Sequence, residues 1–119
     1  MISTRRLATL ALALGLLLVG ACGKQQKDDR IVLGFSQIGA ESEWRTANTE
    51  SIKSAATTSN IDLRFADAQQ KQENQIKALR SFIAQKVDVI AFSPVVETGW
   101  ETVLKEAKNA GIPVILTDR

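Results

Sequence analysis

Residues 31–45 read IVLGFSQIGAESEWR, and this stretch decides the fold class of the chain. Its first five residues contain no polar or charged side chain. Such a run is typical of a central parallel strand that is covered on both faces. A burst of polar, charged and aromatic residues follows at positions 41–45, with Ser42 placed to cap the next helix. Because open α/β sheets bind ligands beyond the carboxyl ends of their strands, this turn is predicted to form one wall of a small-molecule site.

The alternation of a short apolar strand with a helical pattern continues along the rest of the chain. Further strands are expected to start near residues 61, 87 and 114. Residues 61–66 alternate between apolar and charged side chains, which predicts a half-exposed strand at the edge of a sheet. Regular alternation of strands and helices is typical of parallel βαβ units. The predicted fold is therefore a Rossmann-like (flavodoxin-like) α/β domain, βαβαβαβ, with the strand order 2-1-3-4.

Each of the three predicted helices has an apolar face at helical spacing. These faces consist of Trp44, Ala47, Ile52 and Ala55, then Ile76, Leu79, Phe82 and Ile83, and finally Trp100, Val103, Leu104, Ala107 and Ala110. The polar residues 69–75 are interpreted as the solvated start of the second helix. Gly111 is placed to cap the end of the third helix, which Pro113 prevents from continuing. The helices are therefore expected to pack on the sheet through these faces.

The predicted strand order also locates a crevice. In the order 2-1-3-4 the winding reverses between the first and third strands, and ligands bind at this reversal, here between the loops at residues 37–42 and 94–99. Asp118 and Arg119 follow the fourth strand and are expected on the same side. A carboxylate accepts hydrogen bonds from two hydroxyl groups, a guanidinium donates as a fork, and an indole such as that of Trp44 covers the C–H surface of a sugar ring. These groups suit a neutral polyhydroxy ligand.

Each candidate residue also has a purely structural interpretation. Trp44 is equally compatible with a core position in the first helix, whereas Trp100 is interpreted as a core residue because it lies on the apolar face of its helix. The two charged residues after the fourth strand are also compatible with ordinary solvated charges. Glu41 and Glu43 form a possible carboxylate pair for acid–base catalysis, but solvated acids at a helix start, favoured by the helix dipole, explain them more simply.

The composition excludes several classes of function. The chain has no histidine and one cysteine, which rules out Ser-His-Asp and Cys-His catalysis and zinc sites built from histidine and cysteine. It contains neither a GxGxxG nor a GxxxxGKS/T motif, so no nucleotide cofactor and no metal are expected. Arg5 and Arg6 account for the excess of basic over acidic residues, and the remainder is formally neutral. Nucleic acid is therefore not an expected partner.

The first 22 residues have the features of an export signal. Arg5 and Arg6 precede an apolar run at residues 7–19, which is shorter than the roughly 20 residues of a transmembrane helix. Small residues then lead to Cys22, and the tetrad VGAC at residues 19–22 resembles the lipobox of bacterial lipoproteins. This resemblance implies that Cys22 is lipidated. The expected boundaries are a lipoprotein signal peptide at 1–21, a lipidated cysteine with a hydrophilic tether at 22–30, and a globular domain at 31–119.

Five segments carry a resemblance to a known family. They are GFSQIGAESEWR at 34–45, DAQQKQENQIKALRSFIAQKVDVI at 67–90, SPVVETGW at 93–100, VLKEAKNAGIPV at 103–114 and DR at 118–119. In this order and at these intervals they resemble the periplasmic sugar-binding proteins of ribose-type ABC importers, above all the galactofuranose-binding members. Family members close two similar α/β lobes on a sugar. The resemblance therefore implies that residues 31–119 are an incomplete N-terminal lobe.

The resemblance implies a function in binding and not in catalysis. In that family, the turn after the first strand and the Asp-Arg pair after the fourth strand hydrogen-bond the sugar. The implied ligand-binding residues are Glu41, Ser42, Trp44, Arg45, Asp118 and Arg119. The implied partners are a monosaccharide, such as galactofuranose or a similar pentose or hexose, an ABC permease in the inner membrane, and the membrane itself through the lipid on Cys22. Glu43 departs from the family, since galactofuranose binders have glycine there.

Two other functions are compatible with the same fold. The effector-sensing domain of a LacI-type transcriptional repressor shares it, but a repressor needs a DNA-binding helix-turn-helix before the first strand, where this chain has the leader. A carbohydrate hydrolase would use Glu41, Glu43 or Asp118 as its acids. The preferred hypothesis is an exported, lipid-anchored sugar-binding protein at the periplasmic or extracytoplasmic face of the membrane.

Overall fold

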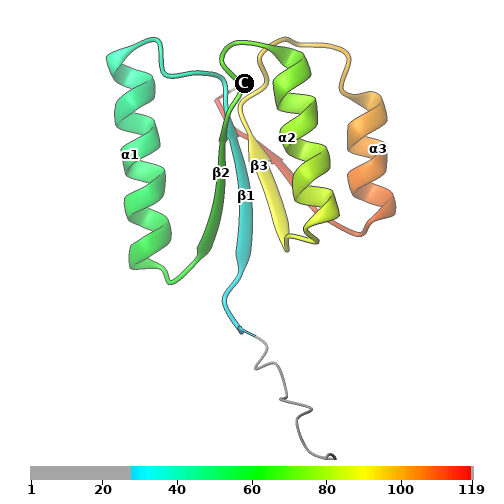
Figure 1. Ribbon diagram of the computed structural model, residues 1–119, viewed down its shortest axis with the longest axis horizontal. Coiled ribbons are helices and arrows are strands. Elements are labelled where there is room, and N and C mark those ends of the chain that lie inside the picture. Colours follow the sequence, from blue (N-terminus) through cyan, green and yellow to red (C-terminus); the bar gives the residue numbers. More distant parts are fainter. Residues whose placement is uncertain (1–27, 119) are drawn as a thin grey trace, which may run out of the picture.

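The computed structural model describes residues 28–118, which form a parallel sheet with helices on both faces (Figure 1). The elements are β1 (Val32–Gln37), α1 (Glu43–Thr58), β2 (Asp62–Asp67), α2 (Gln72–Ala84), β3 (Val89–Phe92), α3 (Glu101–Asn109) and β4 (Val114–Leu116). None of the helices in this range has the length and apolar character needed to cross a membrane. The leader, Cys22 and Arg119 lie outside the described residues, so what the sequence predicts for them stays a prediction.

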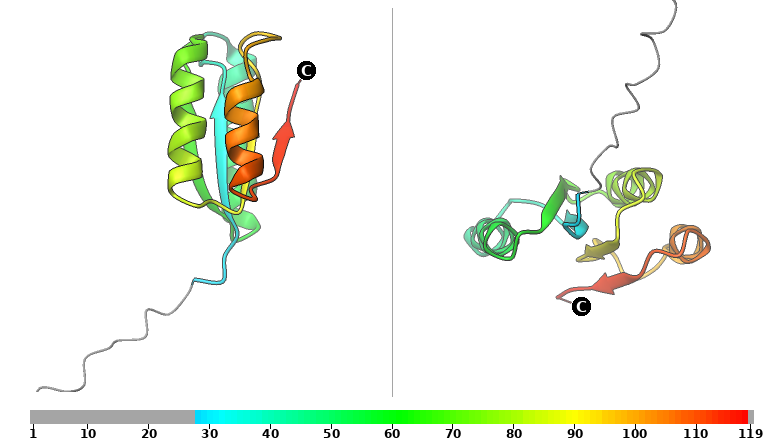
Figure 2. Two further views of the ribbon diagram at one scale, coloured as in Figure 1. Left: turned by 90° about the vertical axis from the view of Figure 1, so that its right-hand side faces the viewer. Right: turned by 90° about the horizontal axis from the view of Figure 1, so that it is seen from below.

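The four strands are parallel and lie in the order β2-β1-β3-β4, which confirms the predicted topology. β1 is central, as its apolar run indicates, and β2 is the half-exposed edge strand. Helix α1 lies on one face of the sheet, and α2 and α3 lie on the other (Figure 2). We call these the α1 face, with Leu33, Phe35, Ala91 and Ile115, and the α2/α3 face, with Gly34, Ser36, Ile90 and Phe92.

The α2/α3 face holds the hydrophobic core of the described residues. Its buried members are Leu79, Phe82, Val87, Ile90, Phe92, Trp100, Val103 and Ile112. The rings of Phe92 and Trp100 lie 5.1 Å apart, so Trp100 is a core residue as predicted. Gly34 lets α2 approach β1 closely, because a Cβ there would lie 2.6 Å from Cγ of Phe82. Since each such buried side chain contributes roughly 1.5–3 kcal/mol, this face is the main source of stability.

The α1 face is only partly covered within residues 28–118. Helix α1 packs beside the edge strand β2, and Ala56 is the buried residue of this helix. The predicted apolar face of α1 is confirmed in direction for three residues, because Trp44, Ile52 and Ala55 all line the cleft toward the sheet. Its burial is not confirmed, since only Ile52 is half-buried, and Ala47 lines a separate hollow at the start of the helix. The physical reason is that one helix beside the edge strand covers too little of the sheet to bury a broad helix face.

The start of α2 also differs from the prediction. The helix begins at Gln72, because Gln69 and Gln70 have left-handed φ values of 52° and 59°. Gln75 was expected to be solvated but is completely buried. Its side chain reaches the ends of β1 and β3, where backbone carbonyl groups accept its hydrogen bonds. A buried polar group needs such partners, and a polar pattern in the sequence does not reveal them.

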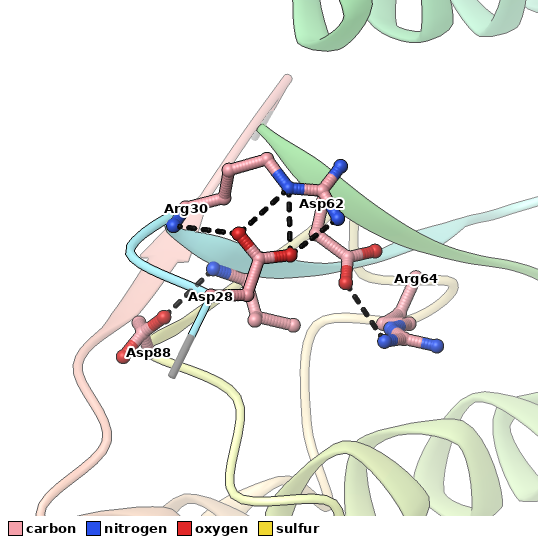
Figure 3. Close-up of polar contacts among 6 residues, drawn as sticks. Asp28, Arg30, Asp62, Arg64 and Asp88 are labelled. Carbon is pink, nitrogen blue, oxygen red and sulfur yellow. Dashed lines mark hydrogen bonds and ion pairs between the residues drawn. The ribbon is translucent and has the colours of Figure 1, made fainter. Parts of the chain in front are cut away.

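Charged side chains make polar contacts at the amino ends of the strands. Figure 3 shows the ion pairs Arg30–Asp28 and Arg64–Asp62 and the contact between Asp88 and Val32. Asp88 accepts a hydrogen bond from the backbone N–H of Val32 at 2.7 Å, which holds the start of β1 next to the start of β3. Hydrogen bonds from Arg30 lower the pKa of Asp28. These contacts belong to the edge of the sheet that faces away from the predicted ligand site.

Candidate ligand-binding site

The candidate site lies at the carboxyl ends of the strands. Four loops meet there, at residues 38–42 after β1, 68–71 after β2, 93–100 after β3 and 117–118 after β4. We call these four loops the rim, and they form the upper edge of the molecule in Figure 1. The reversal of winding between β1 and β3 lies within the rim, which is where doubly wound sheets place a ligand.

Ser42 and Arg45 shape the loop after β1. The Ser42 hydroxyl oxygen accepts a hydrogen bond from the backbone N–H of Arg45 at 3.3 Å, so Ser42 is the N-cap of α1 as predicted. The Arg45 guanidinium forms an ion pair with the carboxylate of Glu41. This pair fixes the direction of both side chains. A guanidinium carries five N–H donors, so Arg45 keeps donors for a further partner.

Gln37 attaches the start of α1 to the end of β1. Its side chain is 2% exposed, and its Nε2 donates to the backbone oxygen of Arg45 at 2.6 Å and to Oγ1 of Thr49 at 2.8 Å. Its Oε1 accepts from Nδ2 of Asn48 at 3.0 Å. This role of Gln37 was not predicted from the sequence. The available signal was a glutamine at the end of an apolar strand, which needs hydrogen-bond partners if it is buried.

The loop after β2 also belongs to the rim, although it was not predicted to be part of the site. Asp67 accepts a hydrogen bond from the N–H of Gln69 at 2.7 Å, which closes a tight turn. The N–H of Gln70 donates to the backbone oxygen of Ile38 at 2.7 Å. A Cβ on Gly39 would lie 3.2 Å from Cγ of Gln70. The loops after β1 and β2 are therefore in direct contact, and Gln70 lies beside the predicted site.

The loop after β3 is connected to α2 and to β4. Nε2 of Gln72 donates to the backbone oxygen of Thr98 at 2.7 Å, next to Gly99, whose φ of 87° favours glycine. The hydroxyl groups of Ser93 and Thr117 lie 2.8 Å apart, which joins the ends of β3 and β4. Thr117 directly precedes Asp118, so this contact helps to place the predicted carboxylate.

Two of the predicted site residues share one cleft. A cleft of about 620 Å³ lies between α1 and the α1 face of the sheet. Trp44 and Asp118 line it near the rim, together with Asn48, Ser93 and Thr117, and its floor is apolar. Trp44 is 59% exposed and does not belong to the core that residues 28–118 form. The indole and the carboxylate that were predicted to contact a ligand therefore face the same space.

The other predicted residues are placed differently. Glu41, Ser42 and Glu43 line a separate hollow at the start of α1. Arg45 is partly buried next to Glu41, between this hollow and the body of the sheet. Arg119 lies outside the described residues. Residues 28–118 thus bring Trp44 and Asp118 together and leave Glu41 and Ser42 on the neighbouring part of the rim.

The chemistry of the rim is that of recognition. It offers carboxylate, amide, hydroxyl and guanidinium groups and one exposed indole, which can hydrogen-bond a polar ligand and cover an apolar surface of it. Within residues 28–118 there is no group of three or more side chains that could hold a metal ion. The doubly wound sheet and this rim define the class of α/β proteins that bind a small ligand at the carboxyl ends of their strands.

Comparison with known proteins identifies the family. Residues 33–119 match the family model described as the periplasmic binding protein domain. The chain is 63% identical over 89 residues to the galactofuranose-binding protein YtfQ of Escherichia coli, an alignment that covers 75% of this chain and 28% of that protein. The chain belongs to the periplasmic binding protein domain family, which confirms the resemblance seen in the sequence.

Two solved structures are similar to this chain and hold furanose sugars. One is a protein of Mycobacterium smegmatis in complex with β-D-fucofuranose, with a TM-score of 0.74 and 72% identity over 75% of this chain and 29% of that one. The other is the arabinose-transporter binding protein of Shewanella sp. ANA-3 with α- and β-L-arabinofuranose, with a TM-score of 0.71 and 66% identity over 71% of this chain and 28% of that one.

These relatives distinguish between the three classes of function considered from the sequence, which are sugar binding, repression and hydrolysis. They are sugar-binding proteins, one of them a component of an ABC transporter, and neither the repressor nor the hydrolase hypothesis is favoured by them. The chain spans between a quarter and a third of their length.

Proposed function

We propose that this chain is the N-terminal part of an exported solute-binding protein that delivers a monosaccharide to an ABC permease. The ligand is a furanose sugar related to galactofuranose, arabinofuranose or fucofuranose, which are the sugars of its relatives. The observation that carries the proposal is that Trp44 and Asp118 both line the rim end of the cleft between α1 and the sheet. The function is binding without catalysis, and the sugar is held between this lobe and a second one.

Each site residue has a proposed role. The indole of Trp44 covers the C–H face of the sugar, and the carboxylate of Asp118 accepts hydrogen bonds from two hydroxyl groups. Arg45 and Arg119 donate hydrogen bonds to ring or hydroxyl oxygens. Glu41 orients Arg45 through their ion pair, and Ser42 both caps α1 and donates its hydroxyl proton to the sugar. These roles are complementary to a neutral polyhydroxy ligand.

Titration calorimetry of the full-length protein with a panel of furanose and pyranose sugars tests the proposal. We expect at least one furanose to bind. In Asp118→Asn, affinity should fall about tenfold or more, because a hydrogen bond to a charged group contributes roughly 1.5–3 kcal/mol. Glu50→Gln is the matched control, because it makes the same chemical change on an exposed part of α1 away from the cleft. No binding across the panel would refute the proposed function.

The proposed second lobe leads to a separate prediction about the affinity of this chain on its own. A single wall buries only part of a ligand, whereas binding sites normally bury most of its surface. Residues 1–119 alone should therefore bind the same sugar much more weakly than the full-length protein. Equal affinity of the two would contradict the two-lobed arrangement and leave sugar binding itself intact.

Glu43 is the proposed determinant of sugar preference. It lines the hollow beside Glu41 and Ser42 and stands where galactofuranose binders have glycine by the resemblance seen in the sequence. An acid side chain there narrows the approach to the rim. In Glu43→Gly, we expect the ratio of affinities for hexofuranose over pentofuranose sugars to rise, measured by the same calorimetric panel. An unchanged ratio would exclude Glu43 from the site.

The lipid anchor is proposed on the tetrad at residues 19–22. Attachment of a lipid to the Cys22 thiol and cleavage before this residue would tether the protein to the membrane through the hydrophilic residues 23–30, on the periplasmic or extracytoplasmic side. Mass spectrometry of the mature protein should show an N-terminal acylated cysteine, and Cys22→Ser should abolish the acyl mass. An unmodified N-terminus beginning at another residue would contradict the anchor without affecting sugar binding.

A further inference from the structure

Gln75 is completely buried on the side of α2 that faces the sheet. Burying a primary amide is strongly unfavourable unless its donors and acceptor find hydrogen-bond partners. An apolar side chain of similar length would fill the same volume without this desolvation cost. What distinguishes Gln75 from such a side chain is therefore the set of groups that it joins.

The side chain of Gln75 joins the ends of two strands. Its Nε2 donates to the backbone oxygen of Ser93 at 2.9 Å and lies 3.3 Å from Oγ and 3.5 Å from the backbone oxygen of Ser36. Its Oε1 accepts a hydrogen bond from the N–H of Val95 at 2.9 Å. Ser36 lies near the end of β1, and Ser93 and Val95 begin the loop after β3. One side chain thus holds both strands that flank the reversal of winding.

Ser93 extends this connection to β4. Its backbone oxygen faces Gln75, and its hydroxyl lies 2.8 Å from Oγ1 of Thr117. Thr117 directly precedes Asp118. We call the series Ser36, Gln75, Ser93 and Thr117 the polar bridge. It runs beneath the rim from β1 across β3 to β4, and no buried side-chain nitrogen or oxygen of the described residues is left without a hydrogen-bond partner.

We propose that Gln75 is a positioning residue for the ligand site, which sets the spacing between the loop after β1 and the loops that carry Ser93 and Asp118. The inference rests on the proposed function. Because Gln75 has no exposed surface, it acts on a ligand only through these loops. Without the bridge, the loops populate additional arrangements, and the apparent affinity falls in proportion to the fraction of molecules that stays competent.

Gln75→Met in the full-length protein tests this role, because methionine fills a similar volume without hydrogen bonds. We expect the affinity for the tightest-binding sugar of the panel to fall about tenfold or more. We also expect the N–H of Val95 to exchange faster with solvent, since it loses its acceptor. Phe82→Leu is the control: it alters the same buried side of α2 in the core, and it should lower stability while leaving sugar affinity and Val95 exchange unchanged.

Thr117→Val supplies a milder second variant. It removes only the contact with Ser93 and keeps the shape of the side chain. We expect it to fold normally and to weaken sugar binding by a smaller factor, about threefold, because one neutral hydrogen bond is lost. If Gln75→Met does not fold, wild-type affinity in Thr117→Val would overturn the polar bridge as a positioning device.

The outcomes separate this inference from the proposed function. Wild-type affinity in Gln75→Met, or an equal loss of affinity in Gln75→Met and Phe82→Leu, would overturn the positioning role. If the wild-type protein binds no sugar at all, the proposed function fails instead. In that case the exchange of the Val95 amide decides only the structural part of the inference, that Gln75 holds the loop after β3: a selective increase in Gln75→Met supports it, and unchanged exchange overturns it.

Discussion

The two faces of the sheet differ in how they are filled. On the α2/α3 face, two helices bury a continuous core around Ile90 and Phe92, and no side chain of this cluster is exposed. On the α1 face, a single helix lies beside the edge strand, and the cleft beneath it leaves Trp44 and Ile115 exposed. The comparison teaches that, within residues 28–118, the α2/α3 face holds the packed core, whereas the α1 face leaves side chains accessible near the rim.

Two buried glutamines, one on each face of the sheet, support the rim. Gln75 reaches the rim through the α2/α3 face and is completely buried, whereas Gln37 reaches it on the α1 face and connects β1 to the first turns of α1. Both glutamines satisfy their hydrogen bonds with groups at the carboxyl ends of strands. The rim is therefore supported from both faces, although within residues 28–118 only the α2/α3 face is fully packed.

The largest expected effect comes from the two tryptophans. Trp100→Ala removes a buried ring from the α2/α3 face and should lower the free energy of unfolding by about 3–5 kcal/mol. Trp44→Ala removes an exposed ring and should change it by less than about 0.5 kcal/mol, while weakening sugar binding. Urea unfolding and calorimetry of the full-length protein measure the two quantities. Similar losses of stability in both variants would abolish the distinction between the faces.

A smaller effect is expected from adding volume to each face. Gly34→Ala places a methyl group against Phe82 and should cost about 1–3 kcal/mol, because the packed face has no room for it. Gly34→Ala combined with Phe82→Leu should recover part of this loss. Ala55→Leu, which adds volume to the open cleft, should cost less than about 0.5 kcal/mol. Urea unfolding provides the measurement, and a larger cost for Ala55→Leu than for Gly34→Ala would reverse the comparison.

The smallest effect concerns the ion pair between the two helices of the α2/α3 face. Arg80 of α2 donates two hydrogen bonds of 2.9 Å to the Glu106 carboxylate of α3. These bonds lower the pKa of Glu106 below its ordinary value of 4.5. The charged form is therefore favoured in the folded state, so its contribution to stability is present above pH 4.5 and is lost as the pH falls through the lower folded pKa.

The difference in stability between wild type and Glu106→Gln should accordingly shrink as the pH falls from neutral to below this range. Added salt should reduce it further, because both side chains are exposed and screened. Unfolding of wild type, Glu106→Gln, Arg80→Met and the double mutant, across pH and salt, isolates the pair. A pH-independent difference would show that Glu106 acts by another contact.

Much of the fold could be predicted because it depends on local pattern. The uncharged strand at residues 31–35 indicated a central position, the alternating residues 61–66 indicated an edge, and both are confirmed by the order β2-β1-β3-β4. Ser42 as an N-cap and Gly111, with a φ of 73°, as a helix end are confirmed for the same reason, since each depends on neighbouring residues alone.

The candidate site could be predicted only in part. Trp44 and Asp118 were expected on one rim and line one cleft. The apolar face of α1 points toward the sheet as predicted for Trp44, Ile52 and Ala55, but it is less buried than expected, because burial depends on how much of the sheet the helix covers. The roles of Gln37, Gln70 and Gln75 were not predicted, because each depends on a partner from another loop or strand. A run of polar residues reads as solvated until its distant partners are known.

The sequence by itself determined the class of fold, the order of the strands and the family, because hydrophobic periodicity and ordered motifs are properties of the chain alone. Only the tertiary structure decided which polar residues support the rim and which aromatic ring is free to meet a ligand. Exposure of Trp44 and burial of Gln75 arise from contacts between segments far apart in the chain. The physical reason is that desolvation depends on the surroundings that the whole fold creates, which no local stretch of residues specifies.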